Sequence, residues 1–267
     1  MASLFSGQAA TSPVHPAAAA GYVGGAVDTY IQGRPEYPAE LSTWLGEVAG
    51  IRAGSIVVDL GAGTGKFTRL LLALQAETIA VEPVADMLSR LVRDVPGAVG
   101  LQGSASSIPL PAASADVVVC AQAFHWFANT AALDEIVRVL RPGGRLVLVW
   151  NLRDAQVPWV QRMDRLVNAY EGDVPRFYKG SWRHAFPHAG LGVLQGWEFA
   201  NAHVGAPEDV ILKRVLSTSF ISALPQAQRD QVRQDLLDLI ADEPALRGRD
   251  VVPVPYRTFA FCALKLS

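Results

Sequence analysis

Short apolar runs alternate with amphipathic segments through the first half of the chain. Four of these runs are almost entirely aliphatic and lack alternating polar residues; they lie at residues 55–60, 78–82, 116–121 and 145–150. A weaker run occupies residues 97–101. Strands that are apolar on both faces are typical of a parallel sheet covered by helices on both sides. The pattern therefore predicts the central strands of an α/β fold.

The segments between these runs have the features of helices. One predicted helix spans residues 67–74, and a second spans residues 84–92, after Pro83, which suits a first helical turn. A third begins at Asn129 or Thr130, a good N-cap, and ends at the breakers of residues 141–144. Its apolar stripe is Leu133, Ile136, Val137 and Leu140. Strands and helices in strict alternation predict a doubly wound α/β sheet with right-handed crossovers.

After residue 150 the alternation stops. A strand is expected at residues 193–204 and another at residues 256–266, and helices at residues 207–216 and 225–241. We interpret residues 153–188 and 205–245 as insertions that form a lid over the carboxyl edge of the sheet. Residues 1–25 are rich in Ala, Gly, Ser and Pro, which predicts a disordered arm. The remainder, residues 26–267, is predicted to be a single domain.

Composition narrows the class of protein. Half of the 267 residues are hydrophobic, and 23 basic residues face 25 acidic ones, for a net charge of −2. This balance gives no reason to expect a nucleic-acid partner, and no apolar run is long enough to span a membrane. Cys120 and Cys262 lie in apolar runs, as buried thiols of a reducing compartment do. We expect a cytoplasmic protein, monomeric or homodimeric.

The most informative segment is residues 56–66, with the sequence IVVDLGAGTGK. A strand that runs into a glycine turn and a helix is how α/β proteins hold adenosine-containing cofactors. A phosphate-binding P-loop requires glycine where Leu60 stands and a hydroxyl residue where Phe67 stands. A dinucleotide loop requires its third glycine where Lys66 stands. The spacing therefore disfavours both cofactor classes.

The observed spacing resembles motif I of the class I S-adenosylmethionine-dependent methyltransferases. That resemblance implies a seven-stranded sheet in the order 3-2-1-4-5-7-6, with the last strand antiparallel. It also implies S-adenosyl-L-methionine as cofactor and S-adenosyl-L-homocysteine as product. Asp59 would then hold the methionine amino group, although it can alternatively cap the loop. Loop residues would let the backbone approach the cofactor closely; they are Gly61, Ala62, Gly63 and Gly65.

Further segments extend the resemblance. Glu82 ends the second predicted strand, where an acid can accept hydrogen bonds from both ribose hydroxyls; the alternative is a solvated acid. Residues 81–88 resemble the family's second motif and add Pro83 and Met87 to the expected cofactor site. Ser104 and Ala105 would border the adenine. The family often has aspartate where this chain has Ser104, so an ordinary loop serine remains an alternative.

Residues 108–127 resemble the type 11 subgroup of these enzymes and place Gln122 beside the cofactor. Residues 30–38 and 255–258 resemble the same subgroup, in particular the trans-aconitate-methyltransferase-like enzymes that act on small molecules. The resemblance implies that Tyr30 and Arg34 meet the methionine end of the cofactor. The alternative is a turn held by the two prolines of residues 30–38.

The acceptor chemistry is less well defined. His125 follows a strand end and is the predicted general base, with a role in the pocket wall as the alternative. Residues 176–184 mix cations with aromatic side chains, which predicts a small carboxylate as acceptor; a solvated helix face is the alternative. His184 and His188 are separated by Pro187, so no metal site is predicted.

Together these features predict an S-adenosylmethionine-dependent methyltransferase for a small-molecule acceptor. Two other classes remain open at this point. One is a protein that binds S-adenosylmethionine without methyl transfer, and the other is an NAD-binding oxidoreductase. The sequence does not name the methyl acceptor, because a fold does not define a substrate.

Overall fold

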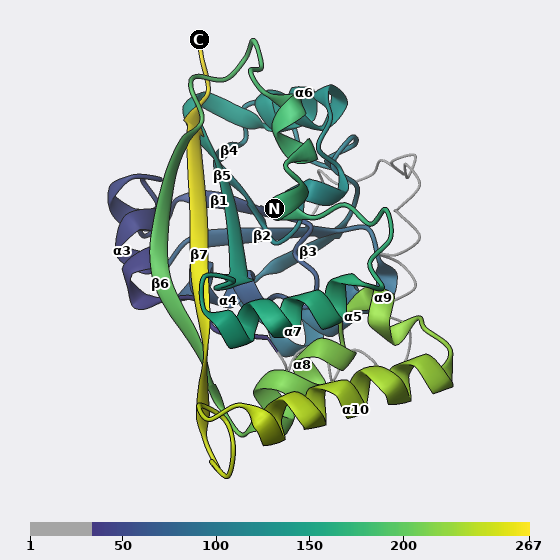
Figure 1. The fold of residues 1–267 in the computed structure, drawn as a ribbon. Helices are drawn as coiled ribbons and strands as arrows, with labels where there is room; N and C mark the ends of the chain where they lie inside the picture. The colour runs from purple at the N-terminus through teal and green to yellow at the C-terminus, as the bar shows by residue number, and fades with distance from the viewer. Residues whose placement is uncertain (1–33) are drawn as a thin grey trace.

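The apolar runs form the strands of one seven-stranded sheet in a computed structural model that describes residues 34–267 (Figure 1). The sheet has the order β3-β2-β1-β4-β5-β7-β6. Neighbouring strands among the first five pair in parallel, whereas β7 pairs antiparallel with both β5 and β6. The predicted fold and strand order are therefore confirmed. Tyr30 and the arm predicted at residues 1–25 lie outside the described residues.

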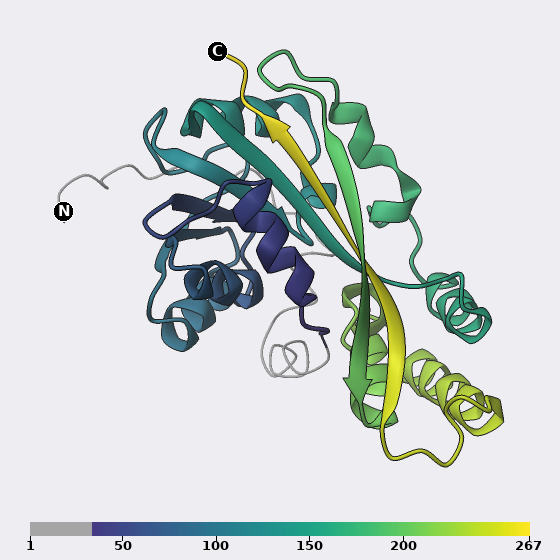
Figure 2. The same ribbon diagram turned by 90° about the vertical axis from the view of Figure 1, so that its left-hand side faces the viewer.

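Strand β5 extends beyond its apolar run at both ends, and β7 begins earlier than predicted. In chain order the strands are β1 Ile56–Leu60, β2 Glu77–Glu82, β3 Val99–Gln102, β4 Ala115–Ala121, β5 Leu140–Arg153, β6 Gln195–Gly205 and β7 Val252–Leu264. The last three are long, and their ends project beyond the parallel part of the sheet (Figure 2). This extension matters for the site, because it carries residues of β5 and β7 past the carboxyl edge of β1 and β4.

Helices of the first half cover the parallel strands. They are α3 Ala39–Glu47, α4 Lys66–Ala73, α5 Ala85–Asp94 and α6 Thr130–Val139. The predicted cap is present, because the Asn129 side chain accepts a hydrogen bond from the backbone N–H of Ala132. The sequence analysis did not predict α3. Its three buried residues, Leu41, Trp44 and Leu45, pack into the core on one face of the sheet.

Residues 141–144, which were predicted to end the third helix, lie within strand β5 instead. The helix ends at Val139, and Leu140 already pairs with Ala115 as the first residue of β5. The next pair in the ladder joins Arg145 to Val117, so residues 141–144 bulge out of the strand. Pairing with β4 thus begins before the glycines rather than after them.

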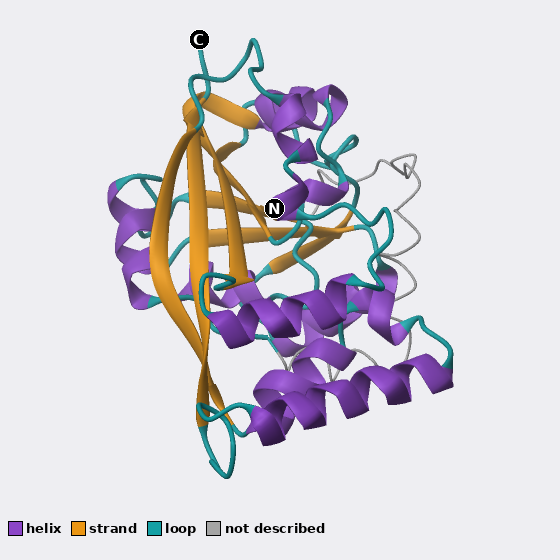
Figure 3. Cartoon of the chain, viewed as in Figure 1, coloured by secondary structure: helices purple, strands orange, loops and turns teal. Residues whose placement is uncertain are grey.

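The two predicted insertions contain two long helices and several short ones. They are α7 Pro158–Asn168, 3-10 helices at Phe177–Lys179 and Ser181–Ala185, a π-helix at Glu208–Lys213, α8 Arg214–Leu216, α9 Ser219–Ser222 and α10 Gln226–Asp242. Helices α7, α8 and α10 gather at the projecting ends of β6 and β7 (Figures 1 and 3). They share one hydrophobic core, which includes Met163, Leu236 and Tyr256. Within residues 34–267, no helix has the length and apolar character needed to cross a membrane.

The segment of residues 177–186 packs elsewhere. Its aromatic side chains lie against the sheet, where Phe177 contacts Trp150 with ring centroids 4.9 Å apart. Trp182 is almost fully buried and lies 5.2 Å from the ring of Phe261 on β7. The aromatic residues of this segment therefore extend the core of the sheet.

Candidate functional site

Two adjoining cavities open at the carboxyl edge of the parallel strands. The first, of about 940 Å³, is lined by the glycine loop and the ends of β1, β2 and β4. The second, of about 600 Å³, is lined by the end of β5, by α7, and by parts of β7. Five residues line both cavities, namely Arg34, Gln122, Trp126, Asn151 and Arg214. A ligand in one cavity can therefore meet a ligand in the other.

The glycine loop forms the floor of the first cavity. Gly61 has a φ of +74°, and a Cβ atom there would lie 2.7 Å from the Cβ of Ala123. Ala62 and Gly63 also line this cavity. Gly65 does not; it precedes α4 with a φ of +83°, and a Cβ atom there would lie 2.8 Å from Val95. Gly65 thus permits the packing of α4 against the C-terminal end of α5.

Asp59 lies fully buried at the end of β1 and lines the first cavity. Its Oδ2 accepts a hydrogen bond of 2.7 Å from the hydroxyl of Thr68, whereas its Oδ1 has no partner among residues 34–267. Burial, opposed by Thr68 and reinforced by the charge of Glu82, raises the pKa of Asp59 to about 7. A buried acceptor without a donor is costly, so a cationic N–H group would fit this position well.

Glu82 ends β2 in the same cavity. Its Oε2 accepts the backbone N–H of Gly63 at 2.8 Å, and its Oε1 accepts that of Val84 at 2.9 Å. Burial raises the pKa of this carboxyl group. Each oxygen keeps a lone pair for a further donor, such as the hydroxyl of a ribose. Pro83 and Met87 line the cavity beside it.

The remaining predicted cofactor residues reach the first cavity from other elements. Ser104 and Ala105 follow β3, and the Ser104 hydroxyl lies 3.3 Å from that of Ser106. Gln122 follows β4 with a φ of +58°, unusual for a residue other than glycine. Its side-chain amide donates to the carbonyl of Asn151 at 3.1 Å. That bond positions Gln122 between the two cavities.

Arg34 belongs to a segment that crosses the glycine loop. Lys66 Nζ donates to the carbonyl of Arg34 at 2.8 Å and pairs with the Glu36 carboxylate at 2.6 Å. The side chain of Asn201 on β6 donates to the carbonyl of Glu36 at 2.9 Å. From the sequence, Lys66 served only to exclude a dinucleotide loop. Neither its contact with this segment nor that of Asn201 was predicted, because no motif marks them.

His125 lies in the 3-10 helix Phe124–Trp126 and lines the second cavity. Its Nδ1 accepts a hydrogen bond of 3.0 Å from the indole N–H of Trp150. Burial, together with the positive charge of Arg176, lowers the pKa of His125 to about 3. A histidine with this pKa is neutral near pH 7 and holds a proton poorly. The hydrogen bond at Nδ1 and the lowered pKa both argue against the predicted role of His125 as a general base.

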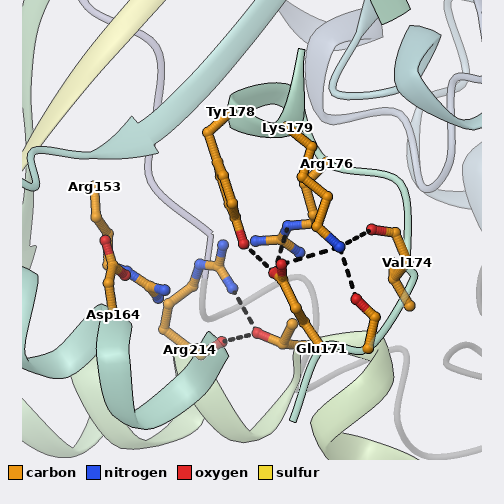
Figure 4. Close-up of polar contacts among 10 residues, drawn as sticks. Arg153, Asp164, Glu171, Val174, Arg176, Tyr178, Lys179 and Arg214 are labelled. Carbon is orange, nitrogen blue, oxygen red and sulfur yellow. Dashed lines mark hydrogen bonds and ion pairs between the residues drawn. The ribbon is translucent and has the colours of Figure 1, made fainter. Parts of the chain in front are cut away.

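Arginines dominate the second cavity, which is lined by six arginines and two aspartates. Arg153 at the end of β5 is only 8% exposed and pairs with Asp164 of α7 at 2.5 Å (Figure 4). Its Nη1 has no partner among the described residues, and neither has Nε of Arg214 nor the hydroxyl of Tyr256. All three residues line the cavity. The residues that line the cavity therefore carry buried, unpaired donors, and an anion that reached them would satisfy them.

Only one cation of residues 176–184 lines this cavity. Arg176 does so, 3.9 Å from Glu171. Lys179 instead donates to the carbonyls of residues 172 and 174 and pairs with Glu171, as Figure 4 shows. Arg183 lies over the ring of Trp182, 4.5 Å from its centroid. The predicted cationic segment thus supplies one cation, beside Phe177 and Tyr178, and neither Arg153 nor Arg214 was predicted from the sequence.

His184 belongs to the 3-10 helix Ser181–Ala185, whereas His188 lies in the loop after it. His188 Nε2 lies 3.1 Å from the carboxylate of Asp134 on α6. Between residues 34 and 267, no group of three His, Cys, Asp or Glu side chains is arranged to hold a metal ion.

Comparisons with known proteins agree with this geometry. The profile of the family described as "Methyltransferase domain" matches residues 58–148. A methyltransferase-like protein of Schizosaccharomyces pombe is 38% identical over 90% of this chain and 93% of its own length. This chain belongs to the S-adenosylmethionine-dependent methyltransferases. A methyltransferase of Mycobacterium tuberculosis is 37% identical over 88% of this chain and 92% of its own.

Solved structures show the same fold for this methyltransferase. One is described as "a Putative Type II Methyltransferase from Anaeromyxobacter dehalogenans". It superimposes with a TM-score of 0.59 at 26% identity, and the match covers 87% of this chain and 96% of that chain. Phosphoethanolamine N-methyltransferase 2 of Haemonchus contortus, solved with S-adenosyl-L-methionine, gives 0.52 at 14% identity, over 90% of this chain and 57% of its own. The cofactor of the family is S-adenosylmethionine, and the buried Asp59 acceptor and the close-packed glycine loop fit it.

Proposed function

We propose that this methyltransferase acts on a small acceptor and methylates a carboxylate of that acceptor in the second cavity. The observation that carries the proposal is the set of buried, unpartnered donors on Arg153, Arg214 and Tyr256. Unpaired buried donors are costly, and hydrogen bonds to an ionised group are the strong ones. An anionic acceptor would satisfy these groups, whereas a cationic acceptor would meet repulsion from six arginines.

The first cavity has a matching assignment in this proposal. Asp59 Oδ1 would accept from the amino group of the cofactor, and Glu82 would accept from its ribose hydroxyls. Gly61, Ala62 and Gly63 would let the backbone approach the cofactor. Further contacts would come from Arg34, Pro83, Met87, Ser104, Ala105 and Gln122, which line the same cavity. A contact from Tyr30 stays a prediction of the sequence.

Little further chemistry is required of the protein. Bound S-adenosylmethionine supplies an activated methyl group: a new O–C bond forms as the C–S bond breaks, and the electron pair of that bond stays on sulfur. A carboxylate is already ionised near pH 7, so no proton has to be removed. The residues around the boundary of the two cavities would orient the acceptor and exclude water.

Two further features support this assignment. The resemblance of residues 30–38 and 255–258 to the trans-aconitate-methyltransferase-like enzymes favours the same class of acceptor. The insertions at residues 153–188 and 205–245 supply Arg153, Arg176 and Arg214, consistent with a lid within one domain of residues 26–267. A cytoplasmic location, a monomeric or homodimeric state and the lack of a nucleic-acid partner stay predictions.

The proposal is tested by turnover with matched acceptors. We expect release of S-adenosylhomocysteine with a panel of short mono-, di- and tricarboxylates, and none with the corresponding amides. Arg176→Gln should raise KM for the best acid about tenfold or more, because it removes a charge that lines the cavity. Arg183→Gln is the matched control, since Arg183 belongs to the same segment and covers Trp182 outside the cavity.

Two outcomes would contradict the proposal. Turnover of neutral or cationic compounds alone would exclude an acid acceptor. Tight binding of S-adenosylhomocysteine without turnover of any compound would instead favour a protein that binds the cofactor and does not transfer the methyl group.

A further inference from the structure

The ring of His125 is fixed between two tryptophans at the boundary of the cavities. Its centroid lies 5.0 Å from that of Trp126 and 6.5 Å from that of Trp150. Trp150 is fully buried on β5 and packs against Phe177 and Trp182. Because Trp126 lines both cavities, His125 stands next to the place where acceptor and cofactor would meet.

The bond from Trp150 defines the tautomer of His125. An indole N–H can only donate a hydrogen bond, so the Nδ1 that receives it carries no proton. A neutral imidazole has one N–H group, which must then be on Nε2. Burial and the charge of Arg176 keep the pKa of His125 low, so the ring stays neutral.

The Nε2–H group has no partner in the part of the chain that the structure describes. Within residues 34–267, His125 makes only one hydrogen bond, the one at Nδ1. The Nε2 atom is not fully buried, so it keeps accessible surface. Since His125 lines the second cavity, this surface opens into it.

We propose that the Nε2–H group of His125 donates a hydrogen bond to the acceptor carboxylate and orients it for methyl transfer. This inference rests on the proposed acid acceptor and gives His125 the role of a specificity-determining donor. A neutral donor suits this position: it binds one carboxylate oxygen without adding another charge to the surrounding arginines. No proton transfer to or from His125 accompanies the reaction.

Two substitutions separate the nitrogens of the ring. In His125→Asn the side-chain oxygen can replace Nδ1 as the acceptor for Trp150, but nothing replaces Nε2. In His125→Gln the amide nitrogen can replace the Nε2–H donor. We expect His125→Asn to raise KM for the best acid roughly 10- to 100-fold, with a smaller effect on kcat. His125→Gln should recover most of that loss, and neither should change the affinity for S-adenosylhomocysteine.

A measurement without turnover tests the tautomer directly. In ¹⁵N-labelled protein bound to S-adenosylhomocysteine, the His125 signals are those missing from His125→Asn, among five histidines. We expect an unprotonated Nδ1 and a protonated Nε2 from pH 5 to 8. Adding the best acid should shift the Nε2 resonance and leave Nδ1 unchanged.

The outcomes distinguish the two proposals. An Nδ1–H tautomer, protonation of the ring above pH 5, or wild-type KM in His125→Asn would overturn the role of His125 while the acid acceptor stands. Turnover of acids with equal losses in both variants would also overturn it. If no acid is methylated although the tautomer is as expected, the proposed acceptor fails and the hydrogen bond to it fails as well.

Discussion

The two adjoining cavities differ in the charged groups that they bury. The first holds two buried carboxyl groups, Asp59 and Glu82, and includes the glycine loop in its lining. The second is lined by six arginines and two aspartates. Burial raises the pKa of both acids and lowers that of Arg176, so each cavity keeps charges at a cost in desolvation. Such a cost is expected where a ligand of opposite charge is to be bound.

The comparison also separates local from distant construction. Most residues of the first cavity lie in one continuous α/β stretch, residues 59–132; residues 34–37, Asn151 and Arg214 complete it. Those of the second come from β5, α8 and β7, far apart in the chain. We therefore expect changes in the glycine loop to act through backbone fit, and changes at Asp59 and in the second cavity to act through charge.

The largest effect should come from the floor of the first cavity. In Gly61→Ala the new Cβ would lie 2.7 Å from Ala123 at a φ of +74°. We expect loss of cofactor binding by at least about 100-fold and destabilisation of about 2–4 kcal/mol. Calorimetry with S-adenosylhomocysteine and thermal unfolding measure both.

Gly143→Ala provides the control for that variant. Gly143 has the same φ of +74°, but a Cβ there would meet no described atom within 4 Å. We expect a cost of about 1 kcal/mol from backbone strain and unchanged cofactor affinity. Equal losses in both variants would show that the backbone conformation, and not the close approach to Ala123, is the decisive feature.

Asp59 should make cofactor binding depend on pH. Its pKa of about 7 in the ligand-free protein must fall when a cationic amino group binds, so binding releases a proton. We expect affinity for S-adenosylhomocysteine to decline by up to about tenfold per pH unit below pH 7 and to level off above it. The raised pKa of Glu82 acts in the same direction.

Asp59→Asn tests the assignment of this dependence. It should lower affinity at pH 8 by roughly 30- to 150-fold and flatten the pH profile. Without ligand, the native state binds the Asp59 proton more tightly than the unfolded chain, so stability falls as pH rises from about 4 to 7. The variant should lose this decline. A wild-type profile in the variant would refute the role of Asp59.

In the second cavity, Arg214→Met should act on the acceptor through charge. It removes a guanidinium whose Nε has no described partner, while its Nη1 donates to Thr218 at 3.3 Å. We expect kcat/KM for the best acid to fall roughly 10- to 30-fold. Unfolding temperature should stay within a few degrees, since no buried partner loses its counter-charge. An unchanged kcat/KM would remove Arg214 from the acceptor site.

The smallest effect should come from the segment over the glycine loop. Glu36 pairs with Lys66, but its side chain is 85% exposed. Glu36→Gln should therefore change the free energy of unfolding by less than about 0.5 kcal/mol and leave cofactor affinity unchanged. A large loss, measured by chemical denaturation, would mean that this ion pair and not the bonds to the Glu36 carbonyl holds the segment in place.

The fold was predictable because its signals are local. Apolar runs without alternation marked five strands, and the spacing of Gly61, Gly63 and Gly65 pointed to one cofactor class. Helix α3 was missed because it precedes the repeating pattern and carries only three buried residues. The start of β5 was misplaced because pairing of Leu140 with Ala115 outweighed the local tendency of residues 141–144 to form a turn.

Local sequence signals were enough to predict the α/β topology and the elements that line the first cavity, since strand periodicity and glycine spacing act over a few residues. The second cavity arises only from tertiary packing, which joins Arg153, Arg214 and Tyr256 across about 100 residues of chain. Tertiary packing also decided the state of His125, because the donor that sets its tautomer comes from Trp150 on the next strand of the sheet. Long-range packing creates such contacts, and no spacing in the sequence records them.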